Sequence, residues 1–157
     1  MTLDYTGKVV IVTGAGGGLG RSHALEFARR GAKVVVNDLG GSVDGSGGSS
    51  EAADKVVEEI KAAGGEAISN GSSVTDDAGV ANMVQQTMDA YGRIDALVNN
   101  AGVLRDKSFA KMEVGDFSFV VDVHLFGTMK PTKAVWPIMK EQGYGRILVT
   151  SSSSGLY

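Results

Sequence analysis

A glycine-rich segment follows the first apolar run of the sequence and has the composition of a phosphate-binding turn. The run covers residues 8–13, and a helical pattern begins at Leu19. Glycines allow a sharp turn and a close backbone approach, while the N–H groups and dipole at a helix start attract a diphosphate. A flexible glycine loop without a ligand is the alternative. The order strand, glycine turn and helix favours a dinucleotide site held by Gly14, Gly16, Gly17, Gly18, Leu19 and Gly20.

Asp38 closes the second apolar run of the sequence and is a candidate ligand for a ribose. In a site built on the glycine turn, a carboxylate here accepts hydrogen bonds from the 2′- and 3′-hydroxyls of the adenosine ribose and repels a 2′-phosphate. No Arg stands directly beside Asp38, so these residues favour NAD over NADP. The alternative is an Asp that only starts the following turn, a common role before a glycine-rich loop.

Short β-branched runs alternate with helical patterns along the chain. The runs are apolar on both faces, as are the strands of a parallel sheet covered by helices. Right-handed crossovers then give an α/β fold with a Rossmann-type doubly wound parallel sheet. We expect strand order 3-2-1-4-5, because the first strand carries the glycine turn. The expected strands are residues 8–13, 32–37, 66–69, 94–99 and 146–151, and the expected helices are 19–30, 51–63, 76–91 and 113–142, the last bent at Pro131 or interrupted near Gly127.

Composition limits the classes of protein. The 157 residues predict a single domain, with the Gly/Ser-rich stretch 39–50 as a surface loop inside it. Without cysteine there is no disulfide framework or thiolate zinc site, and we expect no metal site. The formal charge of -3 and the lack of a basic stripe disfavour nucleic acid. No apolar run is long enough for a membrane helix and the N-terminus has no signal-peptide pattern, so we expect a cytoplasmic protein.

Three motifs together resemble the short-chain dehydrogenase/reductase family. They are the turn Thr-Gly-x-x-x-Gly-x-Gly over residues 13–20, the tetrad Asn-Asn-Ala-Gly over residues 99–102, and the Ser pair that ends the fifth expected strand. Their order and spacing match the family over the whole chain. The resemblance implies a nicotinamide-dependent oxidoreductase with the fold that the strand pattern predicts.

A narrower resemblance points to a substrate. The segments 37–41, 53–60, 104–109 and 144–147 are similar to the dehydrogenase domains of peroxisomal multifunctional enzymes of type 2 and to their bacterial single-domain relatives. That group oxidises (3R)-hydroxyacyl-CoA to 3-ketoacyl-CoA with NAD. The resemblance therefore implies fatty acid metabolism, and a peroxisomal location if the organism is a eukaryote. The alternatives are a 3-oxoacyl-carrier-protein reductase, a hydroxysteroid dehydrogenase, or a module that binds NAD without catalysis.

The resemblance assigns further residues to the cofactor. Ser73 and Val74 would lie near the adenine, although many members of the family have Asp where Ser73 stands. Asn99 would brace the central sheet. A simple polar turn after a strand is the alternative for the two amides of the tetrad. The cofactor pocket would be lined by the remaining three tetrad residues, Asn100, Ala101 and Gly102.

The catalytic residues that the resemblance implies are only partly present. The pattern Ser-Ser-x-x-Gly places the catalytic serine at Ser152, which would orient the substrate oxygen. The family's proton donor is the Tyr of a Tyr-x-x-x-Lys pair further along the chain. Tyr157 is too near Ser152 for that role, and no Lys follows it. We therefore expect residues 1–157 to be the N-terminal part of a longer polypeptide, incomplete as a domain at its C-terminal end and without turnover alone.

His124 stands where many members of the family have an Asn that relays a proton. The multifunctional-enzyme group resembles this sequence in having His there. An imidazole can relay a proton through water near neutral pH. Packing of the ring against a neighbouring helix is an equally good explanation of this residue.

The helix expected over Phe117–Met139 is apolar around nearly its whole surface. Such a helix is buried on all sides, so one face should pack on the sheet and the other against another helix or a second subunit. We expect a homodimer or homotetramer that pairs through this helix. Arg105, Asp106 and Lys107 lie near the expected pocket mouth, where they could meet a CoA phosphate or simply be solvated.

Overall fold

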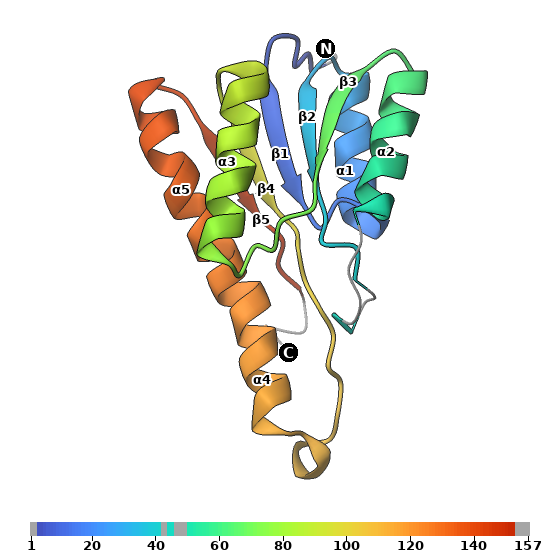
Figure 1. Ribbon diagram of the computed structural model, residues 1–157, viewed down its shortest axis with the longest axis vertical. Coiled ribbons are helices and arrows are strands. Elements are labelled where there is room, and N and C mark those ends of the chain that lie inside the picture. Colours follow the sequence, from blue (N-terminus) through green and yellow to red (C-terminus); the bar gives the residue numbers. More distant parts are fainter. Residues whose placement is uncertain (1–2, 42–43, 46–49, 153–157) are drawn as a thin grey trace.

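The sheet has the expected topology. The computed structural model describes residues 3–41, 44–45 and 50–152, and its five parallel strands lie in the order β3-β2-β1-β4-β5 (Figure 1). Because the order reverses at β1, the carboxyl end of that strand lies where open sheets bind their ligands. The strands are β1 (Val9–Thr13), β2 (Lys33–Asn37), β3 (Glu66–Asn70), β4 (Ala96–Asn99) and β5 (Arg146–Val149).

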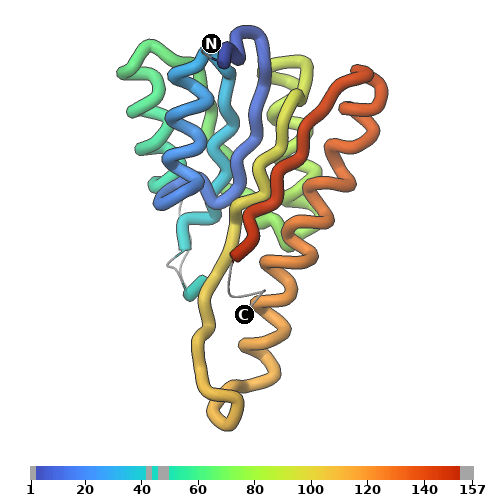
Figure 2. Tube along the Cα trace, turned by 180° about the vertical axis from the view of Figure 1, so that it is seen from behind, coloured from blue at the N-terminus to red at the C-terminus, as the bar shows by residue number. Residues whose placement is uncertain are grey.

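Helices cover both faces of this sheet. One face carries α1 and α2 and the other carries α3 and α5, as the views from the front and from behind show (Figures 1 and 2). Successive strand residues point to opposite faces, so each β-branched run supplies both cores. Val10 and Val34 belong to the core under α1 and α2, whereas Ile11 and Val35 belong to the core under α3 and α5. The four helices are α1 (Gly18–Arg29), α2 (Glu51–Ala62), α3 (Asp77–Tyr91) and α5 (Gly127–Glu141).

The stretch expected as one long helix consists of three elements. α4 (Val114–Val121) leads into a π-helical turn, η2 (Asp122–Phe126), and α5 follows directly. The expected interruption near Gly127 is therefore confirmed. Pro131 has no N–H to give to the carbonyl of Gly127, so a regular helix cannot pass this point with all its hydrogen bonds. Single π turns inside helices are frequent at functional sites.

Two strand boundaries differ from the prediction by two residues, while the other strand ends lie within one residue of it. β4 begins at Ala96, not at Ile94, and β5 ends at Val149, not at Ser151. Ile94 leaves the strand ladder because the side chain of Gln142 takes both its backbone groups, accepting from its N–H at 3.0 Å and donating to its carbonyl at 2.7 Å. The short 3-10 turn η1 (Phe109–Lys111) was not expected, since three residues carry no apolar period.

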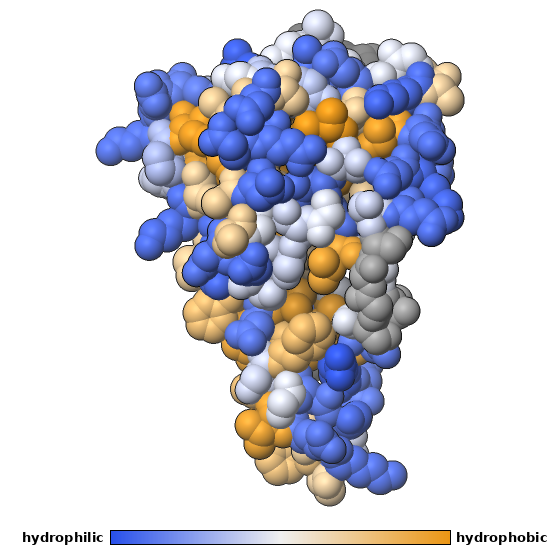
Figure 3. All heavy atoms as spheres, viewed as in Figure 1, coloured by the Kyte–Doolittle hydropathy of each residue, from blue (hydrophilic) through white to orange (hydrophobic). Residues whose placement is uncertain are grey.

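An arm projects beyond the carboxyl ends of the strands. It consists of the extended segment after β4, η1 and α4, and it returns to the sheet through η2 (Figures 1 and 2). Apolar side chains gather along the arm and the start of α5 (Figure 3). The apolar face expected on the long helix is thus present, and in the described part of the chain it is uncovered. Its exposed members include Phe117, Leu125, Phe126, Met129 and Trp136.

β5 forms an edge of the sheet. Its Ile147 packs into the core under α3 and α5, whereas Leu148 points to the other face and is 45% exposed. That face of β4 and β5 has no helix over it in Figure 2. None of the helices formed by the described residues is long and apolar enough to span a membrane.

Candidate functional site

A pocket of about 410 Å³ opens at the carboxyl ends of the central strands. Its volume lies in the range of small-molecule sites. It joins four segments that are distant in sequence: the glycine turn, the end of β2, the turn after β3 and the tetrad after β4. The predicted residues that line it are Gly14, Gly17, Gly18, Asp38, Ser73, Val74, Asn100, Ala101 and Gly102.

The start of α1 differs from the starts of α2, α3 and α4. Its N-cap, Gly17, offers no side chain to the free N–H groups, and no acidic residue stands in the first turn. By contrast, Asp76 caps α3, Glu113 belongs to a capping box on α4, and α2 has acidic residues in its first turn. An added Cβ at Gly17 or Gly18 meets nothing within 4 Å. The donors and the positive dipole end of α1 are therefore left for an anion from outside.

Two glycines allow the turn to contact the tetrad closely. Gly14 has a φ of +61°, and an added Cβ there would lie 2.8 Å from Ala101 Cα. A Cβ at Gly20 would lie only 2.1 Å from the carbonyl oxygen of Gly14. Asn100 Nδ2 donates to the carbonyls of Thr13 and Gly14, each at 3.1 Å. The first glycine segment and the tetrad therefore form one rigid floor.

Thr13 is a part of this floor that sequence reasoning gave no role. Its Oγ1 accepts from the N–H of Asn100 at 3.0 Å and from the N–H of Ala101 at 3.1 Å. The side chain is fully buried. A hydroxyl at the last position of a buried strand, directly before Gly14, was the available signal, because a buried hydroxyl needs partners.

Gly16 and Leu19 do not line the pocket. The N–H of Gly16 donates to Asp38 Oδ2 at 2.7 Å, and a Cβ at Gly16 would lie 2.8 Å from Asp38 Cγ and from Ala52 Cβ. Gly16 therefore makes room for Asp38. Leu19 is 66% exposed. Contact of either residue with a cofactor stays a prediction.

Asp38 stands at the pocket edge with a fixed carboxylate. Oδ2 accepts from Gly16 and Oδ1 accepts from the N–H of Gly40, both at 2.7 Å. Each carboxylate oxygen has a further acceptor site, so Asp38 can still receive hydroxyl donors. Beneath it, the buried Asn37 donates to Asn70 Oδ1 at 2.7 Å and to the carbonyl of Ser72 at 2.9 Å. These bonds position the turn after β3 as the wall opposite the glycines.

The cations nearest to this edge are already paired. A shallow hollow beside the pocket is lined by Gly16, Gly40 and residues of α1 and α2. In it Arg21 pairs with Glu59, and Lys55 pairs with Glu51 at 2.8 Å. Each positive charge there has a carboxylate partner, so the hollow offers little attraction to an additional phosphate.

A second hollow, of about 330 Å³, brings the two candidate catalytic residues together. His124 comes from η2 and Ser152 from the segment after β5, and the tetrad residues Asn100 and Ala101 separate this hollow from the larger pocket. A substrate oxygen near Ser152 would therefore lie beside the cofactor pocket. Tyr157, which we did not expect to be catalytic, lies outside the described residues.

The imidazole of His124 lies against the segment that follows the tetrad. Its Nε2 is 3.1 Å from the N–H nitrogen of Val103 and 2.9 Å from the carbonyl oxygen of Val103. The tautomer decides whether Nε2 accepts from the first or donates to the second. A Cβ at Gly102 would lie 2.8 Å from His124 Cε1, so this glycine makes room for the ring.

Three further predicted residues have internal partners. Asn99, which we expected to brace the sheet, donates from Nδ2 to Thr132 Oγ1 of α5 at 3.0 Å. Arg105 and Lys107, the candidate phosphate ligands, bond the carboxylate of Asp116 at 3.1 and 2.6 Å. The hydrogen bond from Lys107 is the main reason that the pKa of Asp116 lies below its ordinary value.

Comparison with known proteins defines the family. The family model described as short chain dehydrogenase matches residues 8–157. The peroxisomal multifunctional enzyme A of Dictyostelium discoideum is 59% identical over all of this chain and 35% of its own length. A short chain dehydrogenase from Mycobacterium avium superposes with a TM-score of 0.84 at 48% identity, over 96% of this chain and 54% of that one. The chain belongs to the short-chain dehydrogenase family.

A structure solved with a cofactor shares the fold. The 7α-hydroxysteroid dehydrogenase complexed with NADH and 7-oxo glycochenodeoxycholic acid has a TM-score of 0.89 at 32% identity, over 98% of this chain and 56% of that one. The present chain thus spans about a third of the multifunctional relative and about half of each solved structure. The pocket and the hollow of Ser152 and His124 therefore lie in a chain of the short-chain dehydrogenase family.

Proposed function

We propose that this chain is the cofactor-binding part of an NAD-dependent dehydrogenase that oxidises (3R)-hydroxyacyl-CoA to 3-ketoacyl-CoA. The observation that carries the proposal is the pocket in which the uncapped start of α1 and the carboxylate of Asp38 lie together. It adjoins the hollow that holds Ser152 and His124. The substrate class rests on the similarity to multifunctional enzymes that are named as peroxisomal. The same names support a peroxisomal location if the organism is a eukaryote.

The preference for NAD follows from the charges around the ribose position. Asp38 would accept hydrogen bonds from the two ribose hydroxyls, and its negative charge would repel a 2′-phosphate. Arg21 and Lys55, which line the hollow beside Gly16 and Gly40, are paired with Glu59 and Glu51. The 2′-phosphate of NADP would therefore be repelled by the carboxylate of Asp38, and the paired cations Arg21 and Lys55 would attract it only weakly.

We assign the remaining predicted residues by their place in the pocket. The diphosphate would lie on Gly17 and Gly18, where added Cβ atoms meet no neighbours. The adenine would lie on Ser73 and Val74. Ser73 Oγ is 2.9 Å from Thr75 Oγ1, so its hydroxyl is oriented by this turn. The nicotinamide half would follow the tetrad, on Asn100, Ala101 and Gly102, toward the hollow of Ser152.

The chemistry divides between cofactor and protein. The cofactor held by these residues would supply the acceptor for a hydride from the carbon that bears the substrate hydroxyl, and loss of that hydride and of the hydroxyl proton would give the ketone. Ser152 would donate a hydrogen bond to the substrate oxygen and orient it. His124 would pass the released proton to water from the far side of the hollow. We assign no proton acceptor for the substrate hydroxyl among residues 1–157.

The uncovered apolar face supports a homo-oligomer. Phe126, Met129 and Trp136 expose about half of their surface along η2 and α5, at 42%, 43% and 59%. A contiguous exposed apolar patch of this kind marks an interaction surface. We propose that two copies pair through these helices. Sedimentation of the full-length protein as a monomer would count against this pairing.

The activity is tested with the full-length protein that carries this chain. NADH formation is followed with (3R)- and with (3S)-hydroxybutyryl-CoA as separate substrates. We expect turnover of the 3R substrate with NAD, and a loss of about a hundredfold or more in kcat for Ser152→Ala. Ser118→Ala, on an exposed part of α4, is the control that keeps full activity. Turnover that is absent with NAD, or that survives Ser152→Ala, would contradict the proposal.

A further inference from the structure

A groove of about 310 Å³ runs along the projecting arm and shares only Val103 with the lining of the cofactor pocket. One wall is the segment after the tetrad and the other is the side of α4. Its apolar lining comes from Val103, Leu104, Met112, Phe117 and Val120. Leu104 is 58% exposed and Phe117 is 57% exposed. Apolar side chains held open to water in a concave surface favour an apolar occupant.

The groove adjoins the hollow of Ser152. His124 lines both of them. Phe117, Val120 and His124 follow one another at helical spacing, so they share one side of the α4–η2 helix. A chain that starts at a substrate oxygen near Ser152 can therefore pass His124 and continue along Val120 and Phe117.

The charged residues of the groove do not favour an anionic occupant. Asp116 is 7% exposed and is held by both Arg105 and Lys107. Arg105 also donates from Nε to the carbonyl of Asp44 at 2.6 Å and lies 4.9 Å from the ring centroid of Phe119. These bonds connect the walls to each other and pair the charges of Arg105 and Asp116 internally, while the exposed carboxylate of Asp106, which also lines the groove, would repel an anion. The surface left over for contact is mainly hydrocarbon.

We propose that this groove holds the acyl chain of the substrate and determines which chain lengths the protein prefers. The inference rests on the proposed function for the position of the reacting end, and it deepens that function by naming where the hydrocarbon goes. A long chain gains contacts along Phe117 and Val120 that a short chain cannot reach. The protein should therefore bind long-chain acyl-CoA more tightly than short-chain acyl-CoA.

The test compares two tryptophan variants on the same helix. Val120→Trp fills the groove, whereas Val114→Trp, at a position that is 79% exposed and outside the groove, is the matched control. The dissociation constants of palmitoyl-CoA and butyryl-CoA are measured by calorimetry on the full-length protein. We expect Val120→Trp to reduce the preference for palmitoyl-CoA at least about tenfold, and Val114→Trp to keep it. If Val120→Trp does not fold, Leu104→Gln tests the mouth of the groove in the same way.

Several results would overturn the groove as an acyl site. One is a wild-type protein without a preference for palmitoyl-CoA, and another is a Val120→Trp or Leu104→Gln variant that keeps the preference. A variant that changes only the sedimentation of the protein would mark the groove as a contact between copies. Turnover of (3R)-hydroxybutyryl-CoA is recorded separately. If this turnover is absent while the preference for palmitoyl-CoA still depends on the groove, the proposed reaction is rejected and the acyl site is retained.

Discussion

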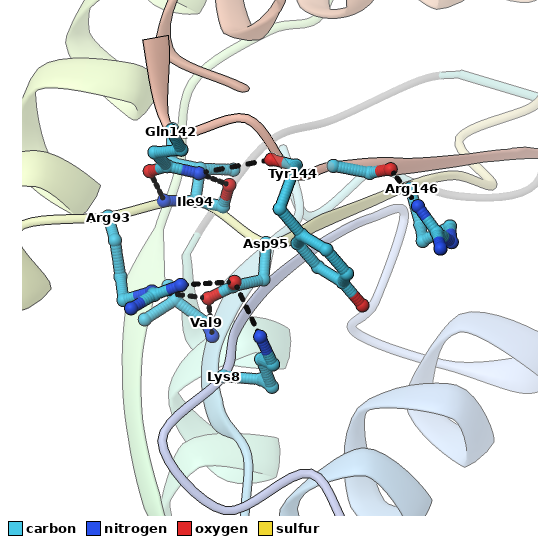
Figure 4. A network of polar contacts seen from close by, with 9 residues as sticks. Lys8, Val9, Arg93, Ile94, Asp95, Gln142, Tyr144 and Arg146 are labelled. Atoms are coloured by element: carbon cyan, nitrogen blue, oxygen red, sulfur yellow. Dashed lines mark hydrogen bonds and ion pairs between the residues drawn. The ribbon is translucent and has the colours of Figure 1, made fainter. Parts of the chain in front are cut away.

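The polar groups at the two ends of the parallel sheet differ in how many hydrogen-bond partners they have within the protein. At the amino end, Asp95 is 2% exposed and its carboxylate accepts from Arg93 at 2.7 Å, from the N–H of Val9 at 2.9 Å and from Lys8 at 3.3 Å (Figure 4). Gln142 closes the same network over the backbone of Ile94. Every group there has an internal partner, which suits a cluster that holds β1, β4 and the end of α5 together.

The carboxyl end keeps its polar groups available. α1 begins without a side-chain cap, and within the described residues Asp38 accepts hydrogen bonds from the N–H groups of Gly16 and Gly40, so both present hydrogen-bonding capacity to the pocket. Polar groups whose hydrogen bonds are all made within the protein contribute to stability and have no capacity left for a ligand. Groups at a rigid edge with hydrogen-bonding capacity left over can bind a ligand. The comparison predicts that mutations at the amino end change stability without changing affinity, and that mutations at the carboxyl end mainly change affinity.

Asp95→Ala should cause the largest loss of stability. It leaves Arg93 and the N–H of Val9 without their buried carboxylate, and breaking a buried pair costs about 3–5 kcal/mol of unfolding free energy. Denaturant unfolding of the full-length protein measures this loss. The protein that remains folded should bind NAD with unchanged affinity. An Asp95→Ala protein with weakened NAD affinity and an unchanged free energy of unfolding would contradict the comparison.

The same cluster predicts a pH dependence. Burial alone would raise the pKa of Asp95, but the hydrogen bonds from Arg93, Val9 and Lys8 outweigh it and the pKa lies below 3.8. A depressed folded-state pKa adds stability above the unfolded value, and this stability is lost as the pH falls through the folded value. The stability difference between wild type and Asp95→Asn should therefore shrink below about pH 4. The free energy of unfolding of both proteins is measured over a series of acidic pH values. A stability difference that grows as the pH falls would refute the prediction.

Gly20→Ala should have an intermediate effect on stability and a large one on binding. The new Cβ would lie 2.1 Å from the carbonyl of Gly14 and 2.6 Å from Asn100 Nδ2, so the floor of the pocket must shift. Overpacking of this kind costs about 1–3 kcal/mol. We expect that the Gly20→Ala protein still folds but shows no NAD binding in a titration. Gly115→Ala, on α4 and outside the pocket lining, with nothing within 4 Å of the added Cβ, is the control that keeps NAD affinity.

Lys8→Met should have the smallest effect. Lys8 is 34% exposed, and Asp95 keeps Arg93 and the N–H of Val9 when it is removed. A partly exposed ion pair contributes about 1 kcal/mol or less. Thermal unfolding should shift slightly, with no change in NAD affinity. A loss as large as that of Asp95→Ala would show that the cluster depends on Lys8 more than its geometry indicates.

The sequence predicted the fold well because one regular pattern determines it. Runs such as residues 33–37 are buried on both faces, and their alternation with helices leaves few possible topologies. Local hydrogen bonds were harder to predict. The role of Gly16 depends on Asp38 and Ala52, which approach it only in the folded chain. The early exit of Ile94 from its strand depends on Gln142, whose position no local pattern indicates.

The site was predictable to the extent that single segments carry it. The glycine turn, Asp38 and the tetrad were each recognisable where they stand, and the structure places them around one pocket. The meeting of His124 with Ser152 was implied only by family resemblance, because the two residues come from different elements. The pairing of Arg105 and Lys107 with Asp116 could not be read from spacing, since the side chains meet across a long loop.

Calorimetric titration of NAD and NADP into wild type and Asp38→Ala tests the central claim most directly. The claim is that the open end of the sheet holds a dinucleotide whose unphosphorylated ribose contacts Asp38. Wild type should bind NAD more tightly than NADP, and Asp38→Ala should weaken NAD and remove most of the difference. Equal affinities in wild type, or a preference for NAD that survives Asp38→Ala, would contradict the account.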